Sequence, residues 1–301
     1  MDDGAQDDSP RMCDAYTKQD SRVRVIHKPN GGLMSAWMAG AEDSSGEYLM
    51  FVDSDDWIDA CMVEELVKCS SGEIVCCNFV IERPNGAEEC RHELAPGVYE
   101  GKKLETEVKR KLLGNERRTV SMSRCMKLFS RELIMDNLHF CNSKLRMGED
   151  VNIVLPALCD CRRLVILKDA LYYHYFYNPA SMVHKYDPEM TEGIRELNRT
   201  IRRILEAKKV ENGKQQAEKE RVYLTMLSVK NELRGGGKGY AKRVAEVCRQ
   251  ERMADSLKQH DIRVQDRVNR MIVWIMKRPD TLHCMAGKVA FSLYDRWMLG
   301  H

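Results

Sequence analysis

The pattern of apolar and polar positions predicts several short strands in the first two thirds of the chain. Five segments are rich in apolar, β-branched or aromatic residues and are too short for ordinary helices. They are residues 23–27, 48–52, 73–81, 164–168 and 171–177. The second of them is an uninterrupted apolar run that ends abruptly in acidic residues, which predicts a buried strand. Residues 82–93 are polar and predict a loop.

Segments with apolar residues three or four positions apart predict helices between and after these strands. In the first part of the chain they are residues 11–19, 34–41, 61–69 and 102–113. Beyond Asp187 the pattern is helical throughout, with charged helices at 191–209 and 216–233 and a break at the three glycines 235–237. The pattern therefore predicts an α/β domain at residues 1–185 and an α-helical region at residues 186–301.

Charge is distributed unevenly along the 301 residues, although the net charge is only +2. Residues 1–190 hold 24 Lys and Arg against 32 Asp and Glu, whereas residues 191–301 hold 24 against 14. A basic helical region suits an anionic membrane surface or partner, and solvated helix faces are the alternative. We predict peripheral membrane contact through this region, with packing onto the α/β domain as the other possibility.

Cysteine usage and hydropathy favour the cytoplasm. The twelve cysteines are scattered, and several lie inside apolar runs, where a free thiol behaves as a small apolar side chain. No secretory signal opens the chain, and the longest apolar run of the helical region, residues 271–276, is far shorter than a membrane span. We predict a cytoplasmic protein, at most peripheral on the inner face of the cell membrane.

A cluster of three carboxylates, Asp53, Asp55 and Asp56, follows the apolar run at 48–52. Ligands of open α/β sheets bind at the carboxyl ends of the strands. Clustered carboxylates repel one another unless a cation or hydrogen-bond donors compensate them, and a divalent ion that bridges protein oxygens and substrate phosphates does so well. Capping of a helix that begins near Trp57 is the alternative explanation.

The residues around this cluster follow a recognisable order. Reading along the chain, they are Asn30-Gly31-Gly32-Leu33, then Gly46-Glu47-Tyr48, then Asp53-Ser54-Asp55-Asp56. In this order, residues 1–185 resemble the nucleotide-sugar domain of family 2 glycosyltransferases. The resemblance implies a GT-A-like, Rossmann-like α/β fold with a mixed sheet. It also implies inverting, metal-dependent transfer of a sugar from a nucleotide-diphosphate donor, such as a UDP-sugar, to a bacterial surface or extracellular polysaccharide.

The same resemblance implies roles for individual residues. Asp53 and Asp55 would hold the cofactor, Mg²⁺ or Mn²⁺. The residues implied in nucleotide-sugar binding are Asp2, Asp3, Asn30, Gly31, Gly32, Asp53, Ser54 and Ser181. The implied partners are the sugar donor and a glycan or lipid-linked glycan acceptor, with no nucleic acid.

A second acidic pair, Glu149 and Asp150, follows Gly148 at the predicted start of a helix. Residues 146–158 resemble the family's E-D motif, and residues 125–133 resemble the strand and turn on its acceptor side. The resemblance makes Asp150 the base that takes the acceptor proton and Glu149 an acceptor-binding or structural partner. A carboxylate at a helix start stays ionised readily because the helix dipole favours its charge. Plain N-terminal capping is the alternative.

The chain also departs from the family pattern. Trp37 and Met38 stand where an arginine and an asparagine are usual, and Met126 stands where an asparagine is usual. In the family, a strand, a helix and a second strand precede the position of Met1, so the resemblance predicts an N-terminally truncated domain. These departures motivate a rival function, a catalytically impaired paralogue that acts as a scaffold. A nucleotidyltransferase, which also uses paired carboxylates and a metal, ranks last.

Overall fold

The computed structural model describes residues 1–70, 72–178, 186–235 and 237–299. The helices are α1 (Ser9–Gln19), α2 (Leu33–Asp43), α3 (Met62–Lys68), α4 (Gly101–Glu107), α5 (Arg131–Asn137), α6 (Glu149–Asp160), α7 (Met190–Ala207), α8 (Gly213–Gly235), α9 (Tyr240–Gln250), α10 (Met253–Gln259), α11 (Arg267–Lys277) and α12 (Thr281–Leu299). The strands are β1 (Tyr48–Met50), β2 (Trp57–Ile58), β3 (Ile74–Arg83), β4 (Gly86–Cys90), β5 (Gly97–Glu100), β6 (Lys127–Ser130) and β7 (Arg163–Phe176). Two 3₁₀ turns, η1 (Lys109–Lys111) and η2 (Leu138–Phe140), complete the described elements.

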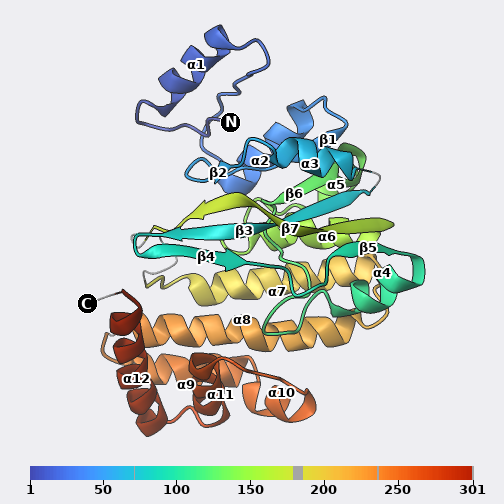
Figure 1. Ribbon diagram of the computed structural model, residues 1–301. Helices are drawn as coiled ribbons and strands as arrows, with labels where there is room; N and C mark the ends of the chain where they lie inside the picture. The colour runs from blue at the N-terminus through green and yellow to red at the C-terminus, as the bar shows by residue number, and fades with distance from the viewer. Residues whose placement is uncertain (71, 179–185, 236, 300–301) are drawn as a thin grey trace.

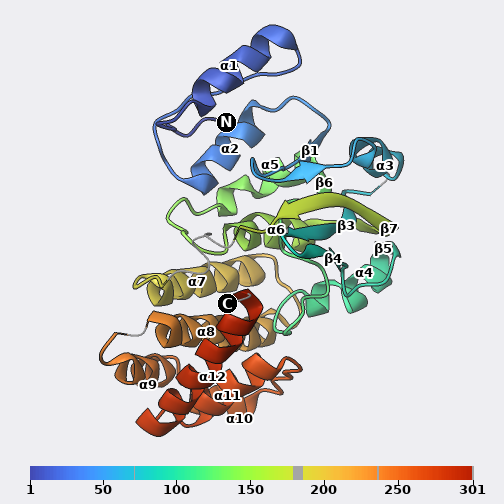
Figure 2. The ribbon, with the colours of Figure 1, turned by 60° about the vertical axis from the view of Figure 1, so that its left-hand side comes forward.

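The strands form one mixed sheet, as the family resemblance implied. The order is β1-β6-β3-β7-β2, with β4 paired to β3 and β5 paired to β7. Only β3 and β7 run parallel to each other, and the other pairs are antiparallel. Figure 1 shows the sheet in the middle of the molecule, with α1 above it and α7 and α8 below. Figure 2 shows the same layers from the side on which α12 lies.

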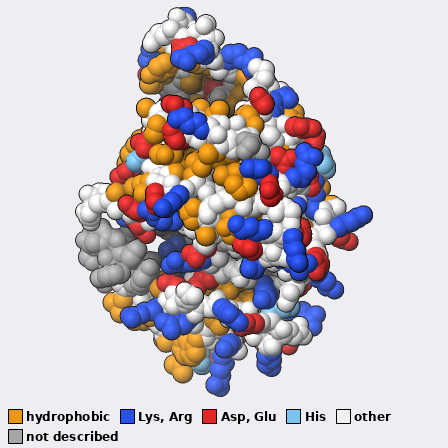
Figure 3. Space-filling model, turned by 45° about the vertical axis from the view of Figure 1, so that its right-hand side comes forward, with side chains coloured by type: hydrophobic (Ala, Val, Ile, Leu, Met, Phe, Trp, Pro, Cys, Tyr) orange, Lys and Arg blue, Asp and Glu red, His pale blue; other side chains and the backbone are white. Residues whose placement is uncertain are grey.

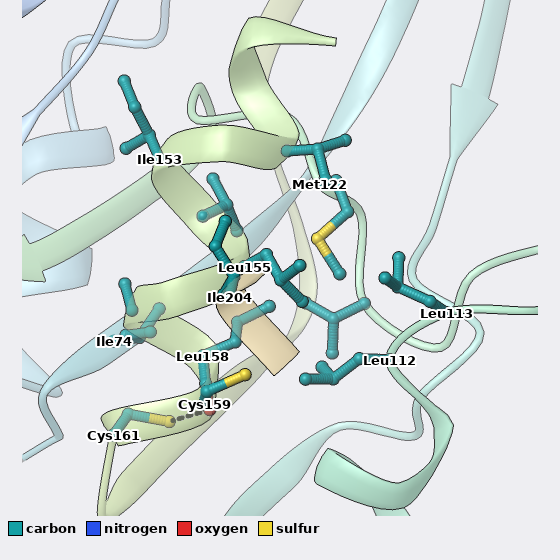
Figure 4. Close-up of a cluster of buried hydrophobic side chains, with 14 of the residues drawn as sticks. Ile74, Leu112, Leu113, Met122, Ile153, Leu155, Leu158, Cys159, Cys161 and Ile204 are labelled. Atoms are coloured by element: carbon teal, nitrogen blue, oxygen red, sulfur yellow. Dashed lines mark hydrogen bonds between the residues drawn. The ribbon is translucent and has the colours of Figure 1, made fainter. Parts of the chain in front are cut away.

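The main core lies between the sheet and helices α6 and α7. Helix α6 is apolar on nearly all sides, and its residues from Val151 to Cys159 are all buried. Figure 4 shows Leu155 and Leu158 of α6 beside Ile74 of β3 and Ile204 of α7, and all four belong to one buried cluster. A helix that is buried on all sides has no polar face, so α6 is fixed by the layers on both of its sides.

Helix α8 joins this core to a second one. Its Ala217 and Leu224 pack in the main cluster, whereas its Val222 and Met226 pack with α9, α11 and α12. The predicted helical region therefore begins as a layer of the main core and continues as a separate bundle, visible at the bottom of Figure 1. Among the described residues, no helix is long and apolar enough to cross a membrane.

Several expected elements differ in the structure. Residues 23–27, expected as a strand, are not a strand in the structure. Asp2 and His27 form an isolated bridge, made by two backbone hydrogen bonds between Asp2 and residues 26 and 28. The apolar run 48–52 is not a fully buried strand: β1 is three half-buried residues at one edge of the sheet, and Val52 is exposed. The polar residues expected as a loop at 82–93 instead contain the hairpin of β3 and β4.

The two β segments predicted at 164–168 and 171–177 are one long strand, β7, with an irregularity between them. Asp169 has φ of 52°, in the left-handed region, and the pairing with β3 shifts register at this point. An extra residue in one strand bends the strand and interrupts its ladder. The interruption explains why the sequence pattern shows two segments where the backbone forms a single strand.

Two hydrogen bonds hold the ring of His92 in its neutral form. Its Nε2 bonds the carbonyl oxygen of Cys77 at 3.0 Å, and the Ser121 amide donates to its Nδ1 at 3.2 Å. A neutral ring serves both contacts, whereas a protonated Nδ1 would face the Ser121 N–H as a second donor. Burial lowers the pKa of His92 to about 3, and the neighbouring Lys127 ammonium acts in the same direction.

We therefore expect His92 to make the fold sensitive to acid. Because the pKa of the folded state lies below that of the unfolded state, the unfolded chain takes up the proton first, and stability falls as the pH drops below about 6.5. Lowering the pH from roughly 7 to roughly 5 should cost the wild type up to about 2 kcal/mol more than it costs His92→Gln. Urea unfolding of both proteins at the two pH values measures this difference, and equal losses would contradict it.

Candidate functional site

The acidic cluster after β1 forms a tight turn that is tied to the end of β7. The Asp56 amide donates to the Asp53 carbonyl oxygen at 3.1 Å, which closes the turn. The Asp56 carboxylate accepts from the Tyr173 hydroxyl at 2.5 Å and from the Phe176 amide at 2.9 Å. Asp56 is therefore a structural anchor, and the turn presents its other carboxylates outward.

Asp150 enters the same region from the start of α6. The helix begins after Gly148, which has φ of 70°, and a Cβ atom at this position would lie 2.4 Å from Cδ2 of Leu197. Only glycine satisfies both the left-handed backbone and the close approach of α7. The packing of α7 thus sets where α6 begins and where Glu149 and Asp150 lie.

Arg124 joins the two acidic groups. Its Nη1 donates to Asp150 Oδ1 at 2.6 Å, and its Nη2 donates to Asp53 Oδ1. The arginine side chain is 4% exposed, whereas the Asp53 and Asp150 side chains are 38% and 33% exposed. The guanidinium is therefore the buried part of the site, and the two carboxylates lie between it and solvent.

The ring of Trp37 holds this arginine from the opposite side. The guanidinium carbon lies 3.4 Å from the ring centroid, the geometry of a cation–π contact. Trp37 belongs to α2, two turns of helix at most from the Gly31-Gly32 turn at the start of that helix. The residue that replaces the family's usual arginine therefore supports an arginine that comes from another part of the chain.

Burial and neighbouring charges shift the pKa values of several groups around Arg124. Burial raises the pKa of Asp53, and the Arg124 charge opposes that rise. Burial also raises the pKa of Glu149. Beneath the site, Lys127 is completely buried, burial lowers its pKa, and its Nζ donates to the Ser123 carbonyl oxygen at 2.6 Å. This last contact holds the loop that carries Arg124.

The residues expected to bind the nucleotide gather in a second cluster near the N-terminus. The Asp3 carboxylate pairs with Lys28 at 2.5 Å and accepts from the Gly31 and Gly32 amides at 3.1 Å and 2.8 Å. Gly4 packs against Asn30, since a Cβ atom on Gly4 would lie 3.1 Å from the Asn30 nitrogen. Asp3, Asn30, Gly31 and Gly32 are thus brought together as expected.

Asp2 lies beside this cluster but has other contacts. Its carboxylate bonds His27 Nδ1 at 2.7 Å and accepts from the Gly4 and Ala5 amides. The hydrogen bond from His27 lowers the pKa of Asp2. Its observed contacts hold the N-terminal segment to residues 26–28.

Three of the expected residues have few contacts or none to describe. Ser54 and Asp55 are exposed at the tip of the turn, and Ser181 falls outside the described residues. His174, near the end of β7, stacks on Trp57 at a centroid distance of 5.2 Å and bonds Glu82 at 2.8 Å.

Comparison with known proteins agrees with this arrangement. Residues 1–138 match the model of the family described as glycosyl transferase family 2. This region belongs to glycosyltransferase family 2. A longer similarity extends beyond the matched residues: the chain is 31% identical over 199 residues to the uncharacterized glycosyltransferase EpsJ of Bacillus subtilis. That alignment covers 64% of this chain and 56% of EpsJ, so the chain spans about half the length of the curated relatives it matches.

Two further similarities concern a short segment and the fold. Over 67 residues, 22% of each protein, the chain is 46% identical to the glycosyltransferase GlyG of Streptococcus pneumoniae. The structure of S. aureus TarS in complex with UDP-GlcNAc superposes with a TM-score of 0.53 at 16% identity, covering all of this chain and 82% of the TarS chain. The chain therefore has the expected GT-A fold with a helical C-terminal region.

The carboxylates of the acidic turn fit a divalent cation that would be bound together with substrate phosphates. Among the described residues, no three His, Cys, Asp or Glu side chains gather into a metal cage. Mg²⁺ usually binds through one or two carboxylates together with substrate phosphates and water. The exposed Asp55 suits this mode. Asp53 is already paired with Arg124, so it can become a second ligand only if that pair opens.

Sequence reasoning missed Arg124 and the roles of Trp37 and Tyr173. One signal was present: clustered carboxylates require a compensating donor, and the sequence interpretation assigned that role to a metal alone. The pairing of Arg124 with Asp53, 71 positions away, has no local periodicity to reveal it. Trp37 was noted only as a departure from the family pattern.

Proposed function

We propose that this glycosyltransferase moves a sugar, with inversion, from a nucleotide-diphosphate donor to a glycan or lipid-linked glycan acceptor, with UDP-sugars as the first donors to test. A polysaccharide of the bacterial surface is the acceptor class that the resemblance favours. One observation carries the proposal. Arg124 joins Asp53 of the acidic turn to Asp150 of α6, so the expected donor site and the expected base share one small site.

In the proposed reaction, an acceptor hydroxyl oxygen attacks the anomeric carbon while the bond to the diphosphate breaks on the opposite face. Asp150 takes the hydroxyl proton. Its Oδ1 is held by Arg124, whereas its Oδ2 has no hydrogen bond among the described residues and is free to accept a proton. The electron pair of the broken bond leaves with the nucleoside diphosphate.

The remaining side chains bind and orient the substrates. Asp55 and, after its ion pair opens, Asp53 would hold Mg²⁺ or Mn²⁺, which supplies Lewis-acid stabilisation of the diphosphate when it is bound. The Asp3 carboxylate accepts from the Gly31 and Gly32 amides and so holds the turn at the start of α2, the end of a helix that favours anionic ligands. Released from Asp53, the Arg124 guanidinium would face the departing phosphates. Such positioning supplies much of the rate in reactions that ask little covalent chemistry of the protein.

The rival function, a scaffold that does not bind donor, draws support from the same ion pair. A guanidinium that occupies both Asp53 and Asp150 could block the site permanently. The two functions differ in what Arg124 does when donor is present, and donor binding therefore separates them.

Thermal unfolding of the purified chain with UDP, with and without Mn²⁺, tests the donor site. A ligand that binds only the folded state stabilises it, by about 2.7 kcal/mol at a concentration near 100 times its dissociation constant. For a chain of this size we expect a metal-dependent rise in Tm of roughly several degrees. Asp55→Ala should abolish the rise, whereas Asp136→Ala, which removes an exposed carboxylate on α5, should keep it. A folded chain with no shift would favour the scaffold.

A further inference from the structure

Helix α12 exposes an apolar face to solvent. Leu282, Met285, Val289 and Leu293 are 74%, 55%, 62% and 61% exposed. Their spacing of three and four positions places them on one side of the helix. The other exposed residues described on α12 are Thr281, Ala286, Ala290 and Ser292, so the outward face between 281 and 293 has no charged side chain.

The orientation of α12 is fixed by its packing. Its inner face consists of Cys284, Gly287 and Phe291, all buried. A Cβ atom at position 287 would lie 2.2 Å from Cδ1 of Ile275, so α11 approaches α12 so closely that only glycine fits there. The Lys288 side chain is also turned inward, because it donates to the Leu233 carbonyl oxygen at 3.1 Å. Rotation of the helix cannot bury the apolar stripe without breaking these contacts.

The surface next to the stripe is strongly basic. Residues 267–293 contain five Lys and Arg and a single acidic residue, Asp280. Four of the five cations are exposed on or just after α11, at Arg267, Arg270, Lys277 and Arg278. Trp274, 46% exposed, lies at the border of the two surfaces and stacks on His283 at a centroid distance of 4.3 Å. Lys and Arg side chains also lie over the lower part of the molecule on the side away from α12, as Figure 3 shows with the right-hand side of Figure 1 turned forward.

No described element covers α12 from outside. In Figure 2 it lies at the front of the lower half of the molecule, and its contacts are with α8, α9 and α11 behind it. In Figure 1 it stands on the left-hand side, toward which β3 and β7 run. The apolar face therefore lies on the side of the molecule at which the parallel strands end.

We propose that this face, the α12 stripe with the cations of α11 beside it, binds the surface of an anionic lipid bilayer. Apolar side chains in a line with Lys, Arg and Trp along the border match the interface between acyl chains and anionic headgroups. A second copy of the chain is a poorer fit, because a two-fold contact over α12 brings the basic surfaces of both copies together. The inference goes beyond sugar transfer, since it holds whether or not the chain is active.

Sedimentation of the full chain with lipid vesicles tests the proposal. We expect binding to vesicles that contain phosphatidylglycerol and at least about tenfold weaker binding to phosphatidylcholine alone, since the exposed cations of α11 are attracted to anionic headgroups. The Leu282→Glu/Val289→Glu variant should lose at least about tenfold in binding because the stripe no longer enters the interface. Val63→Glu/Val67→Glu, which places the same two charges on apolar residues of α3 with 46% and 44% exposure, should bind as the wild type does.

Circular dichroism and the UDP-dependent Tm shift serve as controls, because the glutamates lie on a solvent-exposed face and should change neither. Light scattering addresses the second copy. A dimer that the two glutamates convert to a monomer, together with no binding to anionic vesicles, overturns the proposal. Equal binding of Leu282→Glu/Val289→Glu and wild type to the vesicles overturns it as well.

Discussion

Replacing Asp150 with asparagine is expected to lower kcat by about 10²–10⁴-fold, the contribution of a well-placed general base. Asparagine keeps the shape of the side chain and can still accept a hydrogen bond from Arg124, but its amide cannot take the acceptor proton. In the proposed function donor binding depends on the acidic turn and on α2, so the UDP-dependent rise in Tm should persist. The variant thereby separates chemistry from binding.

The measurement is the release of UDP from a UDP-sugar, with Tm of the unliganded protein as a check on folding. The check matters because Arg124 keeps only one carboxylate partner in the variant, and a buried charge that loses a partner destabilises a fold. Glu149→Gln is the variant to compare with Asp150→Asn. Glu149 also lies at the start of α6, but it forms no ion pair with Arg124 among the described residues. If Asp150→Asn turns over within about threefold of the wild type, Asp150 is not the base.

The sequence predicted which residues form the site better than it predicted the contacts between them. The order of the motifs placed Asp53 after a strand and Asp150 at a helix start, and the structure has both. It brings Asp3 to the Gly31-Gly32 turn as expected. What it adds is the cation between Asp53 and Asp150. Ion pairs between distant segments depend on the packing of layers, and periodicity along the chain does not record that packing.

Met126 shows how a departure from a family pattern acquires a physical meaning. The residue has φ of 55°, a left-handed conformation that asparagine adopts more readily than most side chains. The family's usual asparagine therefore suits this backbone, and Met126 adopts it while 3% exposed within a buried cluster. Together with the contact between Lys127 and Ser123, this fixed turn determines where Arg124 emerges.

The fold was predictable where a segment has one apolar face and less so elsewhere. Helix α7 was expected at 191–209 and occurs at Met190–Ala207, with its buried residues packed against α6 and α8. The helical region that contains α12 was expected to meet a membrane or to pack onto the α/β domain. Only the structure shows that Gly287 and Phe291 fill the inner face and leave Leu282 and Val289 outside.

Arg124 decides between an enzyme and a blocked site, and its replacement should have the second large effect. If the guanidinium supports the departing diphosphate, Arg124→Gln should lower kcat/KM by about 10²–10³-fold, the usual cost of removing a donor aimed at developing charge. If the ion pair of Arg124 with Asp53 instead never opens and blocks the site, the same substitution should strengthen UDP binding. We expect the loss, measured as UDP release together with the UDP-dependent Tm shift. Arg162→Gln, which removes an exposed arginine paired with Glu73, should change neither.

The Trp37 ring should matter only through this arginine. Trp37→Leu removes a cation–π contact of about 0.5–2 kcal/mol and should lower kcat/KM by roughly three- to thirtyfold. In the Arg124→Gln background the same change should have little further effect, because the ring then has no cation to hold. Additive losses in the double variant would show that Trp37 acts on its own, for example through the nucleotide. A coupling close to the whole effect of Trp37→Leu assigns the ring to positioning Arg124, the cation that links the acidic turn to α6.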